Sequence, residues 1–491
     1  MPVDRGRRSQ KAGCPSTAGV DRAARLPYPR APPSHRRFLR GESLLAESIV
    51  EGLNPEQRAA VETTEGPLLV LAGAGSGKTR VLTHRIAYLI GACAIAPEAI
   101  LAVTFTNKAA AELRERVEKL LGPDGKGVWV ATFHSTCVRL LRREIERLGR
   151  ARSFVIYDDG ESQALLRETL RRHGLDPKGP DARRVHWRID QWKNVGQGPA
   201  AAAAAANDLD DERAAALYKT YQGLLAEANA LDFGDLLMMT VELFDAHPEV
   251  LARYQERWQY VMVDEYQDTN RVQYRLVNQL AAAHRNLCVV GDPNQSVYGW
   301  RGADIRNILD VETDFPDVAV VKLERNYRST EPILAGANAV VANNHDRREL
   351  VLRSEKGDGE PIRLYRARDE RDEAQFVVQG ILEGVRSESR SYGHFAVLYR
   401  TNAQSRPIAS AGWSGGMVSD SSSKRRRNSA MRAAERPPSS HVKRSPSRSV
   451  APRAAASASA RSSVVLPMPR AGTFTTRRSA RPSAGFTMSR K

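Results

Sequence analysis

The chain is poor in cysteine and has no long hydrophobic run. Its 491 residues contain 4 cysteines, Cys14, Cys93, Cys137 and Cys288, and none lies in a CxxC or another metal-binding spacing. This excludes a disulfide-stabilised scaffold and a cysteine-based zinc or iron–sulfur site, and it favours a reduced, cytoplasmic compartment. No run reaches the roughly 18 apolar residues that a membrane-spanning helix needs, so no membrane partner is expected.

The middle of the chain lacks positive charge. The formal net charge is +17, but residues 1–40 hold 10 Lys and Arg against 2 Asp and Glu, and residues 411–491 hold 17 against 2. Residues 41–410 therefore carry a net charge of −6. A basic balance is typical of proteins that bind nucleic acid. Because the excess comes from the two ends, charge alone does not identify such a protein.

Neither end has the pattern of a folded domain. Residues 1–47 are rich in Arg, Pro and Ala, and we predict that they are disordered or upstream sequence. Residues 407–491 form a basic tail, and 411–491 alone hold 18 Ser and 14 Arg with few apolar runs. Two interpretations of this tail are open: a disordered segment that binds nucleic acid, or an out-of-frame translation. The abrupt change after Arg406 favours the second.

Between the ends, short apolar runs alternate with helical patterns. Four runs have the length of buried parallel strands, at residues 67–75, 99–106, 260–265 and 286–292. Helical patterns such as 108–121 and 137–148 separate them, which predicts an α/β fold with a parallel sheet. The mostly helical stretch 131–257 predicts an inserted subdomain. Within it, the alanine-rich run 199–208 is either a helix or a surface linker.

A glycine-rich loop follows the first of these runs. Residues 72–79 read AGAGSGKT and lie between the apolar LLVL and a helical pattern, which is the context of a phosphate-binding loop. Glycines let backbone N–H groups approach phosphates, and the following helix N-terminus favours negative charge. Lys78 would reach the β- and γ-phosphates of a nucleotide, and Thr79 would bind Mg²⁺. The alternative, a chance glycine-rich turn, does not explain the strand–loop–helix context.

Two adjacent carboxylates end another predicted strand, in VMVDEYQD at residues 261–268. Asp264 is placed to hold Mg²⁺, and Glu265 to act as the general base on an attacking water. An ordinary acidic loop after a strand would have the same residues. The phosphate-binding loop elsewhere in the chain favours the catalytic interpretation.

Eight segments lie in a characteristic order and spacing along residues 48–406. They are LNPEQRAAV (53–61), AGAGSGKTR (72–80), TFTNKAAAEL (104–113), TFHSTC (132–137), VDEYQDTN (263–270), VGDPNQSVYGWRGAD (290–304), LERNYRST (323–330) and LYRTNAQSR (398–406). Together they resemble the UvrD/PcrA/Rep superfamily 1 DNA helicases, and a chain of eight segments is more specific than any one of them.

The resemblance implies RecA-like P-loop motor domains with ATP between them. It implies a first motor domain from 48–130 and 258–320, an inserted helical subdomain at 131–257, and the start of a second motor domain at 321–406. It also implies ATP- and Mg²⁺-dependent movement in the 3′→5′ direction on single-stranded DNA and separation of duplex junctions, in DNA repair or replication. It indicates no particular protein partner.

The resemblance also implies roles for residues at the nucleotide. Gln57 would read adenine, Arg80 and Tyr327 would sandwich its ring, and Gln295 would couple the γ-phosphate to the grip on DNA. Arg328 would reach the γ-phosphate from the second motor domain. The phosphate cradle itself would be Ala72, Gly73, Ala74, Gly75, Ser76, Gly77, Lys78 and Thr79.

On the DNA side, the resemblance implies that Phe105, Tyr298 and Trp300 stack on bases, which grips any sequence. Arg301 would link Trp300 to the nucleotide site. Four further residues would contact the DNA backbone: Thr104, Asn107, Thr132 and His134. Phe105 as a core residue and His134 as a core or capping residue are the open alternatives.

The chain departs from the family after residue 406. The family continues with a large second insertion and the rest of the second motor domain, and 407–491 contain nothing comparable. Predicted strands at 361–367 and 394–400 would then lack neighbours. We therefore expect the 491-residue chain to bind ATP weakly and not to unwind DNA. A rival interpretation is a non-catalytic DNA-binding protein that acts through the basic ends.

Overall fold

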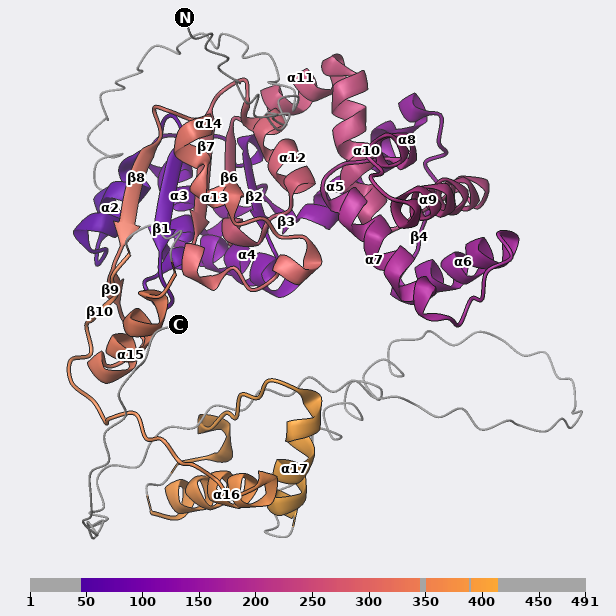
Figure 1. Ribbon diagram of the computed structural model, residues 1–491. Coiled ribbons are helices and arrows are strands. Elements are labelled where there is room, and N and C mark those ends of the chain that lie inside the picture. Colours follow the sequence, from indigo (N-terminus) through magenta and orange to yellow (C-terminus); the bar gives the residue numbers. More distant parts are fainter. Residues whose placement is uncertain (1–45, 345–349, 388–389, 414–491) are drawn as a thin grey trace, which may run out of the picture. The chain divides into compact units, whose positions relative to one another are not determined.

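The computed structural model describes residues 46–344, 350–387 and 390–413. These residues fall into two units, one reaching Gly357 and one starting at Asp358 (Figure 1). The predictions for the ends lie largely outside the described residues. At the inner borders, residues 46–50 are helical with Ile49 and Val50 buried, and residues 407–413 of the predicted tail are helical as well. None of the described helices combines the length and apolar character needed to cross a membrane.

A six-stranded parallel sheet organises the first unit. Its strands lie in the order β3 (Trp129–Thr132), β2 (Ile100–Thr104), β6 (Tyr260–Val263), β7 (Asn286–Gly291), β1 (Leu68–Ala72) and β8 (Ala319–Leu323). The four predicted strands are thus confirmed as β1, β2, β6 and β7. Because all six strands are parallel, their carboxyl ends lie along one edge of the sheet, where ligands bind in open α/β sheets.

Both faces of this sheet are buried, which explains why its strands are continuous apolar runs. One face packs against α2 (Pro55–Glu62), α3 (Lys78–Gly91) and α4 (Asn107–Leu121). The other packs against α5 (Phe133–Glu144), α10 (Phe233–Ala246), α11 (Pro248–Arg257), α12 (Arg271–Ala281), α13 (Arg306–Leu309) and α14 (Val311–Asp314). Alternate residues of one strand serve opposite faces, as Leu69 and Val70 do.

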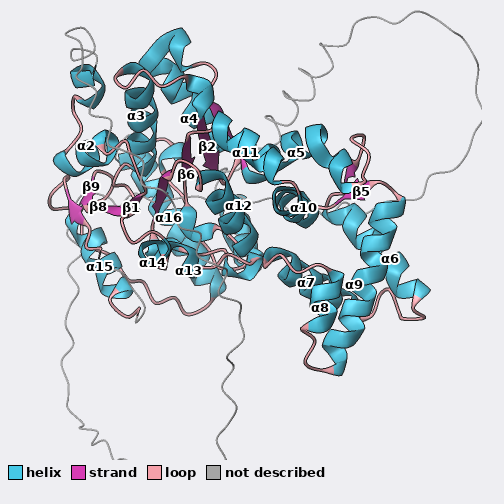
Figure 2. Cartoon of the chain, turned by 90° about the horizontal axis from the view of Figure 1, so that it is seen from above, coloured by secondary structure: helices cyan, strands magenta, loops and turns pink. Residues whose placement is uncertain are grey.

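The stretch between β3 and β6 is helical, as predicted. Besides α5, α10 and α11 it contains α6 (Asp159–Arg172), α7 (Pro180–Asn194), α8 (Pro199–Ala204) and α9 (Leu209–Glu227), and one short parallel pair, β4 (Val155–Ile156) with β5 (Ala230–Leu231) (Figure 2). A separate core that includes Leu170, Trp192 and Tyr218 holds α6, α7 and α9 together. The alanine-rich run begins as α8, so the helical alternative holds for 199–204.

The first unit continues beyond β8. A two-residue strand, β9 (Arg325–Asn326), pairs with β10 (Arg353–Ser354), and α15 (Glu331–Val341) lies between them in the chain. This unit reaches Gly357, whereas the resemblance ended the first motor domain at residue 320. The domain bounds therefore remain a prediction.

The second unit does not form the strands predicted for it. Its α-helices are α16 (Glu370–Ser387) and α17 (Ser405–Trp413). Residues 361–367 have no regular structure, and 394–400 contain the end of a short 3-10 helix and one isolated bridge residue. The prediction of strands there was wrong. Leu364 is 96% exposed and Leu398 is 77% exposed, so these two leucines lack the apolar cover that a buried strand would give them. Without a neighbouring strand, the backbone hydrogen bonds of a sheet cannot form.

Candidate nucleotide site and nucleic-acid cleft

The phosphate-binding loop joins β1 to the N-terminus of α3. Gly75 and Gly77 have φ of 72° and 95°, which glycine adopts without strain. Ser76 is fully buried and its hydroxyl donates to the Gly73 carbonyl oxygen at 2.8 Å. That bond closes the loop upon itself. The first amides of α3 have no acceptor within the helix, as at any helix start, and can therefore bind an anion.

Lys78 and Glu265 meet at the carboxyl edge of the sheet. The Lys78 Nζ lies 3.3 Å from the Glu265 Oε2, and the lysine side chain is 11% exposed. Beside them, burial and then the charge of Glu265 raise the pKa of Asp264 to about 6. The two predicted carboxylates and the loop lysine are therefore brought together, although the lysine and the carboxylates are 186 positions or more apart in the chain.

Gln267 connects Glu265 to the loop after β7. Its amide nitrogen donates to the Glu265 Oε2 at 2.8 Å, and its amide oxygen accepts from the Asp292 backbone N–H at 3.0 Å. Gln295 donates in turn to the Asp292 carboxylate, so it reaches Glu265 only through two intermediates. Glu265 itself has φ of 51°, an unfavourable backbone conformation that such contacts hold in place.

The predicted adenine residues surround the other end of the loop. Gln57 is 1% exposed, and its amide donates to the Ser76 carbonyl oxygen at 2.9 Å, so it is directed at the loop. Tyr327 is 43% exposed, and its hydroxyl accepts from the Asn54 amide at 2.9 Å. The Arg80 guanidinium donates to the Gly52 carbonyl oxygen at 3.0 Å.

Arg328 lies directly against the loop. The Asn326 amide donates to the Ala74 carbonyl oxygen, and the Asn326 side-chain oxygen accepts from the Arg328 N–H at 2.8 Å. A β-carbon on Gly75 would lie 2.6 Å from the Arg328 Cβ, and one on Gly73 would lie 2.3 Å from the Leu352 side chain. Glycine is therefore required at both positions by the segment that covers the loop.

The donor set fits Mg²⁺. Thr79 and Asp264 offer a hydroxyl and a carboxylate, and this cation prefers oxygen ligands, with the remaining positions filled by phosphates and water. Among the described residues no group of three His, Cys, Asp or Glu side chains forms a self-sufficient metal cage. Asp264 is a buried acid whose raised pKa a divalent cation would lower.

The predicted stacking residues form the wall of a cleft of about 710 Å³ next to this site. Phe105 stacks on Tyr298 with ring centroids 5.1 Å apart, and Tyr298 lies 6.5 Å from Trp300. Trp300 is 66% exposed, and the Arg301 guanidinium lies 4.6 Å from the centroid of its ring. Phe105 is thus half-buried in a cleft rather than a core residue.

The four residues predicted to contact the DNA backbone differ in their exposure and in their own hydrogen bonds. Thr104 is buried and its hydroxyl donates to the Thr106 carbonyl oxygen, whereas Asn107 is exposed. Thr132 caps α5 through the Ser135 N–H. His134 is half-buried on the cleft wall, where burial lowers its pKa.

Sequence reasoning missed Phe233, a further aromatic residue of this cleft. It is 46% exposed, lines the same cleft and meets His134 edge to face at 5.7 Å. An aromatic residue between two acidic residues at a helix start, in LDFGD (231–235), was the available signal. It was not used because the whole stretch was assigned to a helical insertion.

Comparison with known proteins agrees with this geometry. Residues 53–316 match the UvrD/REP helicase N-terminal domain, and residues 321–411 match the UvrD-like helicase C-terminal domain. The chain belongs to the UvrD/REP helicase family. Members of this family similar to the chain include proteins named ATP-dependent DNA helicase PcrA from Staphylococcus aureus and Staphylococcus epidermidis, each 49% identical over 361 residues. The match covers 74% of the chain and 49% of each relative, so the chain spans about half the length of these UvrD/REP helicases.

Proposed function

We propose that this chain has the nucleotide site and the DNA cleft of an ATP-driven motor that moves 3′→5′ along single-stranded DNA and separates duplex junctions, in repair or replication, and that the 491-residue chain is itself impaired in this activity. The observation that carries the proposal is the ion pair of Lys78 with Glu265 and its connection through Gln267 to Asp292, in the loop that continues to Tyr298 and Trp300. A cation and a base within 3.3 Å of each other can act on one phosphate. A hydrolytic site joined to a stacking surface is the arrangement that a DNA motor needs.

In this proposal the loop amides and Lys78 bind the β- and γ-phosphates of ATP. Glu265 accepts a proton from the water that attacks the γ-phosphorus, the bond to the bridging oxygen breaks, and ADP and phosphate leave. Thr79 and Asp264 hold Mg²⁺, which when bound neutralises charge on the phosphate oxygens. Arg328 stabilises the transferring phosphoryl group, and Gln295 reports its state through Asp292.

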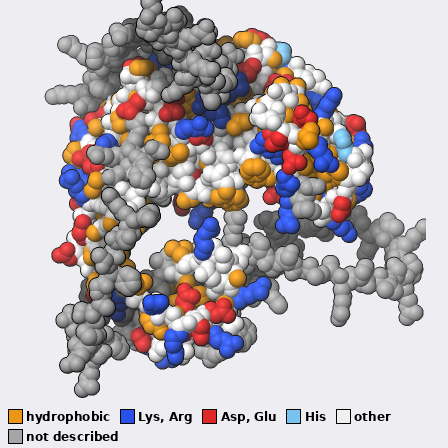
Figure 3. Space-filling model, viewed as in Figure 1, with side chains coloured by type: hydrophobic (Ala, Val, Ile, Leu, Met, Phe, Trp, Pro, Cys, Tyr) orange, Lys and Arg blue, Asp and Glu red, His pale blue; other side chains and the backbone are white. Residues whose placement is uncertain are grey.

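Adenine recognition is assigned to Gln57, Arg80 and Tyr327. Because Gln57 donates to Ser76, reading adenine requires the glutamine to exchange that bond. Phe105, Tyr298 and Trp300 stack on bases, with Arg301 supporting Trp300. The remaining DNA contacts are assigned to Thr104, Asn107, Thr132 and His134. On the face in Figure 3 the described basic and acidic side chains are interspersed.

The test is DNA-stimulated ATP hydrolysis. Since little activity is expected of the 491-residue chain, it is assayed beside a chimera in which residues after Arg406 are replaced by the corresponding part of the Staphylococcus aureus relative. In the chimera, Lys78→Ala and Glu265→Gln should each lower the stimulated rate by at least about 10²-fold. The matched control is Lys119→Ala, an exposed lysine on α4, which should leave the rate unchanged.

Two outcomes would contradict the proposal. A chimera that unwinds only duplexes with a 5′ tail contradicts the direction of movement. DNA binding that ignores both ATP and Lys78→Ala, and that weakens steeply with salt, supports instead a non-catalytic protein acting through its basic ends.

A further inference from the structure

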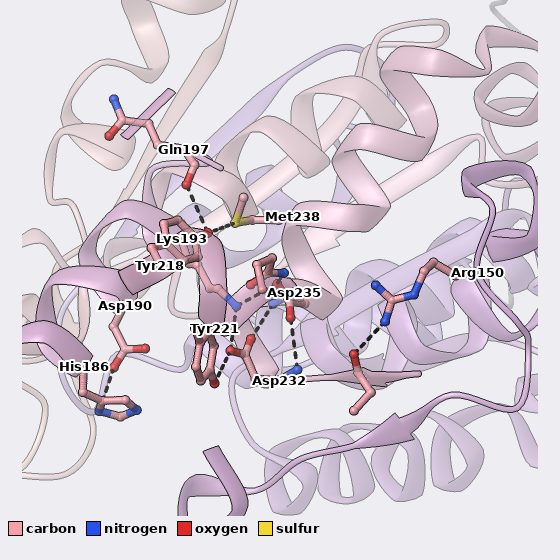
Figure 4. Close-up of polar contacts among 12 residues, drawn as sticks. Arg150, His186, Asp190, Lys193, Gln197, Tyr218, Tyr221, Asp232, Asp235 and Met238 are labelled. Atoms are coloured by element: carbon pink, nitrogen blue, oxygen red, sulfur yellow. Dashed lines mark hydrogen bonds and ion pairs between the residues drawn. The ribbon is translucent and has the colours of Figure 1, made fainter. Parts of the chain in front are cut away.

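A buried lysine links the helical region to the cleft. Lys193, in the last turn of α7, has a side chain that is 2% exposed, and its Nζ lies 2.6 Å from the Asp232 Oδ2 and 2.7 Å from the Asp235 Oδ1. Figure 4 shows the ammonium group directed at both carboxylates. Tyr221 also donates to Asp232, at 3.0 Å. A charge removed from water to this extent needs such partners.

Electrostatics favour the ionised pair. Burial opposes the charge on Lys193, but the two carboxylates outweigh it and raise the lysine pKa. Burial likewise opposes ionisation of Asp232, and the attraction of Lys193 together with hydrogen bonds lowers the pKa of that carboxyl below its ordinary value. The lysine is therefore a fixed cation, and removing it leaves uncompensated carboxylates.

Phe233 lies between these two aspartates in the sequence, in the turn that begins α10. Asp232 caps α10 by accepting from the Asp235 N–H at 2.9 Å, and Asp235 accepts from the Asp232 N–H in return. A β-carbon on Gly234 would lie 2.7 Å from the Lys193 Cδ, so the lysine stem runs against the backbone of this turn. The direction in which the Phe233 ring points is thus set by the turn that Lys193 holds.

Asn194, the next residue of α7, contacts the turn that carries Trp300. Asn194 donates to the Arg301 carbonyl oxygen at 3.3 Å and accepts from the Asn270 amide at 2.8 Å. Gly302, with φ of 84°, leaves room for it, because a β-carbon there would lie 2.3 Å from the Asn194 amide. Asn194 therefore holds the turn that carries Trp300.

We propose that Lys193 and Asn194 are positioning residues that set the spacing of two aromatic residues that line the cleft, Phe233 and Trp300. One helix end would then fix both rings from adjacent positions. This inference rests on the proposed DNA-binding function. It adds that the helical region determines how single-stranded DNA is gripped, through residues that do not themselves need to touch it.

A double-mutant cycle tests the inference with fluorescein-labelled oligothymidylate and the 491-residue chain. Lys193→Met keeps the stem but removes the charge, and it should raise the Kd about tenfold, close to the loss expected from Phe233→Ala. In the Phe233→Ala background the same change should have no further effect. Lys219→Met, the same substitution at an exposed position of α9, should leave the Kd unchanged.

Asn194→Ala combined with Trp300→Ala forms a second cycle on a half-buried residue, and it decides the matter where Lys193→Met fails to fold. Effects that multiply in both cycles would overturn the inference, because a residue that only stabilises the fold acts independently of either ring. An unaltered chain that does not bind oligothymidylate overturns the proposed function itself. Binding with multiplying effects overturns only the positioning role.

Discussion

The nucleotide site and the aromatic cleft share one edge of one sheet but are built differently. At the nucleotide site the groups next to the phosphate-binding loop are buried or paired: Gln57 is 1% exposed, and Lys78 has an ionic partner at 3.3 Å. In the cleft Trp300 is 66% exposed and held from behind by Arg301. A site that acts on one phosphate needs fixed charges. A surface that must accept any base needs faces that stay open.

A substitution at Gln267 should affect the nucleotide site far more than the aromatic cleft. Gln267→Ala removes the contact that orients Glu265 and the contact to Asp292 together. We expect the DNA-stimulated ATPase rate of the chimera to fall by about 10²-fold, because a general base that loses its orientation loses most of its effect. The affinity for oligothymidylate should change by less than about twofold, since no aromatic ring moves.

The matched control is Gln259→Ala, the same change at an exposed position before β6. A Gln267→Ala variant that loses DNA affinity and ATPase activity in equal proportion would show that the two regions are one cooperative site.

A substitution at Trp300 should act on DNA binding in the aromatic cleft. Trp300→Ala is expected to raise the Kd for oligothymidylate roughly tenfold, while Trp300→Phe keeps most of the affinity because a ring remains. The dependence of the Kd on salt should not change, since stacking releases no counterions. Fluorescence anisotropy over a range of salt concentrations measures both quantities. A reduced salt dependence in Trp300→Ala would mean that the tryptophan acts by placing Arg301 on a phosphate.

The two regions also differ in how far the sequence predicts them. The strands and the phosphate-binding loop follow from local patterns, because a buried parallel strand is a continuous apolar run and a loop of this kind has a fixed spacing. The cleft depends on pairs that are distant in the chain. Lys193 meets Asp232 39 positions later, and Asn194 meets Arg301 107 positions later.

Local patterns misled at two kinds of position. A lysine near the end of an amphipathic helix reads as a solvent-facing residue, and only the fold shows that Lys193 is buried. Apolar runs at 361–367 and 394–400 read as strands, but a strand also requires a neighbour, which the run itself does not specify. Phe233 was overlooked because its stretch was assigned as a whole to the helical insertion, and only the fold shows that this residue lines the cleft.

The smallest expected effect is that of His134 on the pH dependence of stability. It shows whether the cleft wall around this residue favours a neutral or a charged side chain. Burial lowers its pKa below the ordinary 6.5, so the folded state keeps the ring neutral while the unfolded state takes up a proton. Stability is therefore unaffected above about pH 6.5 and falls as the pH drops below it. In His134→Gln this part of the loss should disappear from the pH dependence of urea unfolding. A steeper acid loss in His134→Gln would mean that the histidine is held as a cation, and the cleft wall would then carry charge as the nucleotide site does.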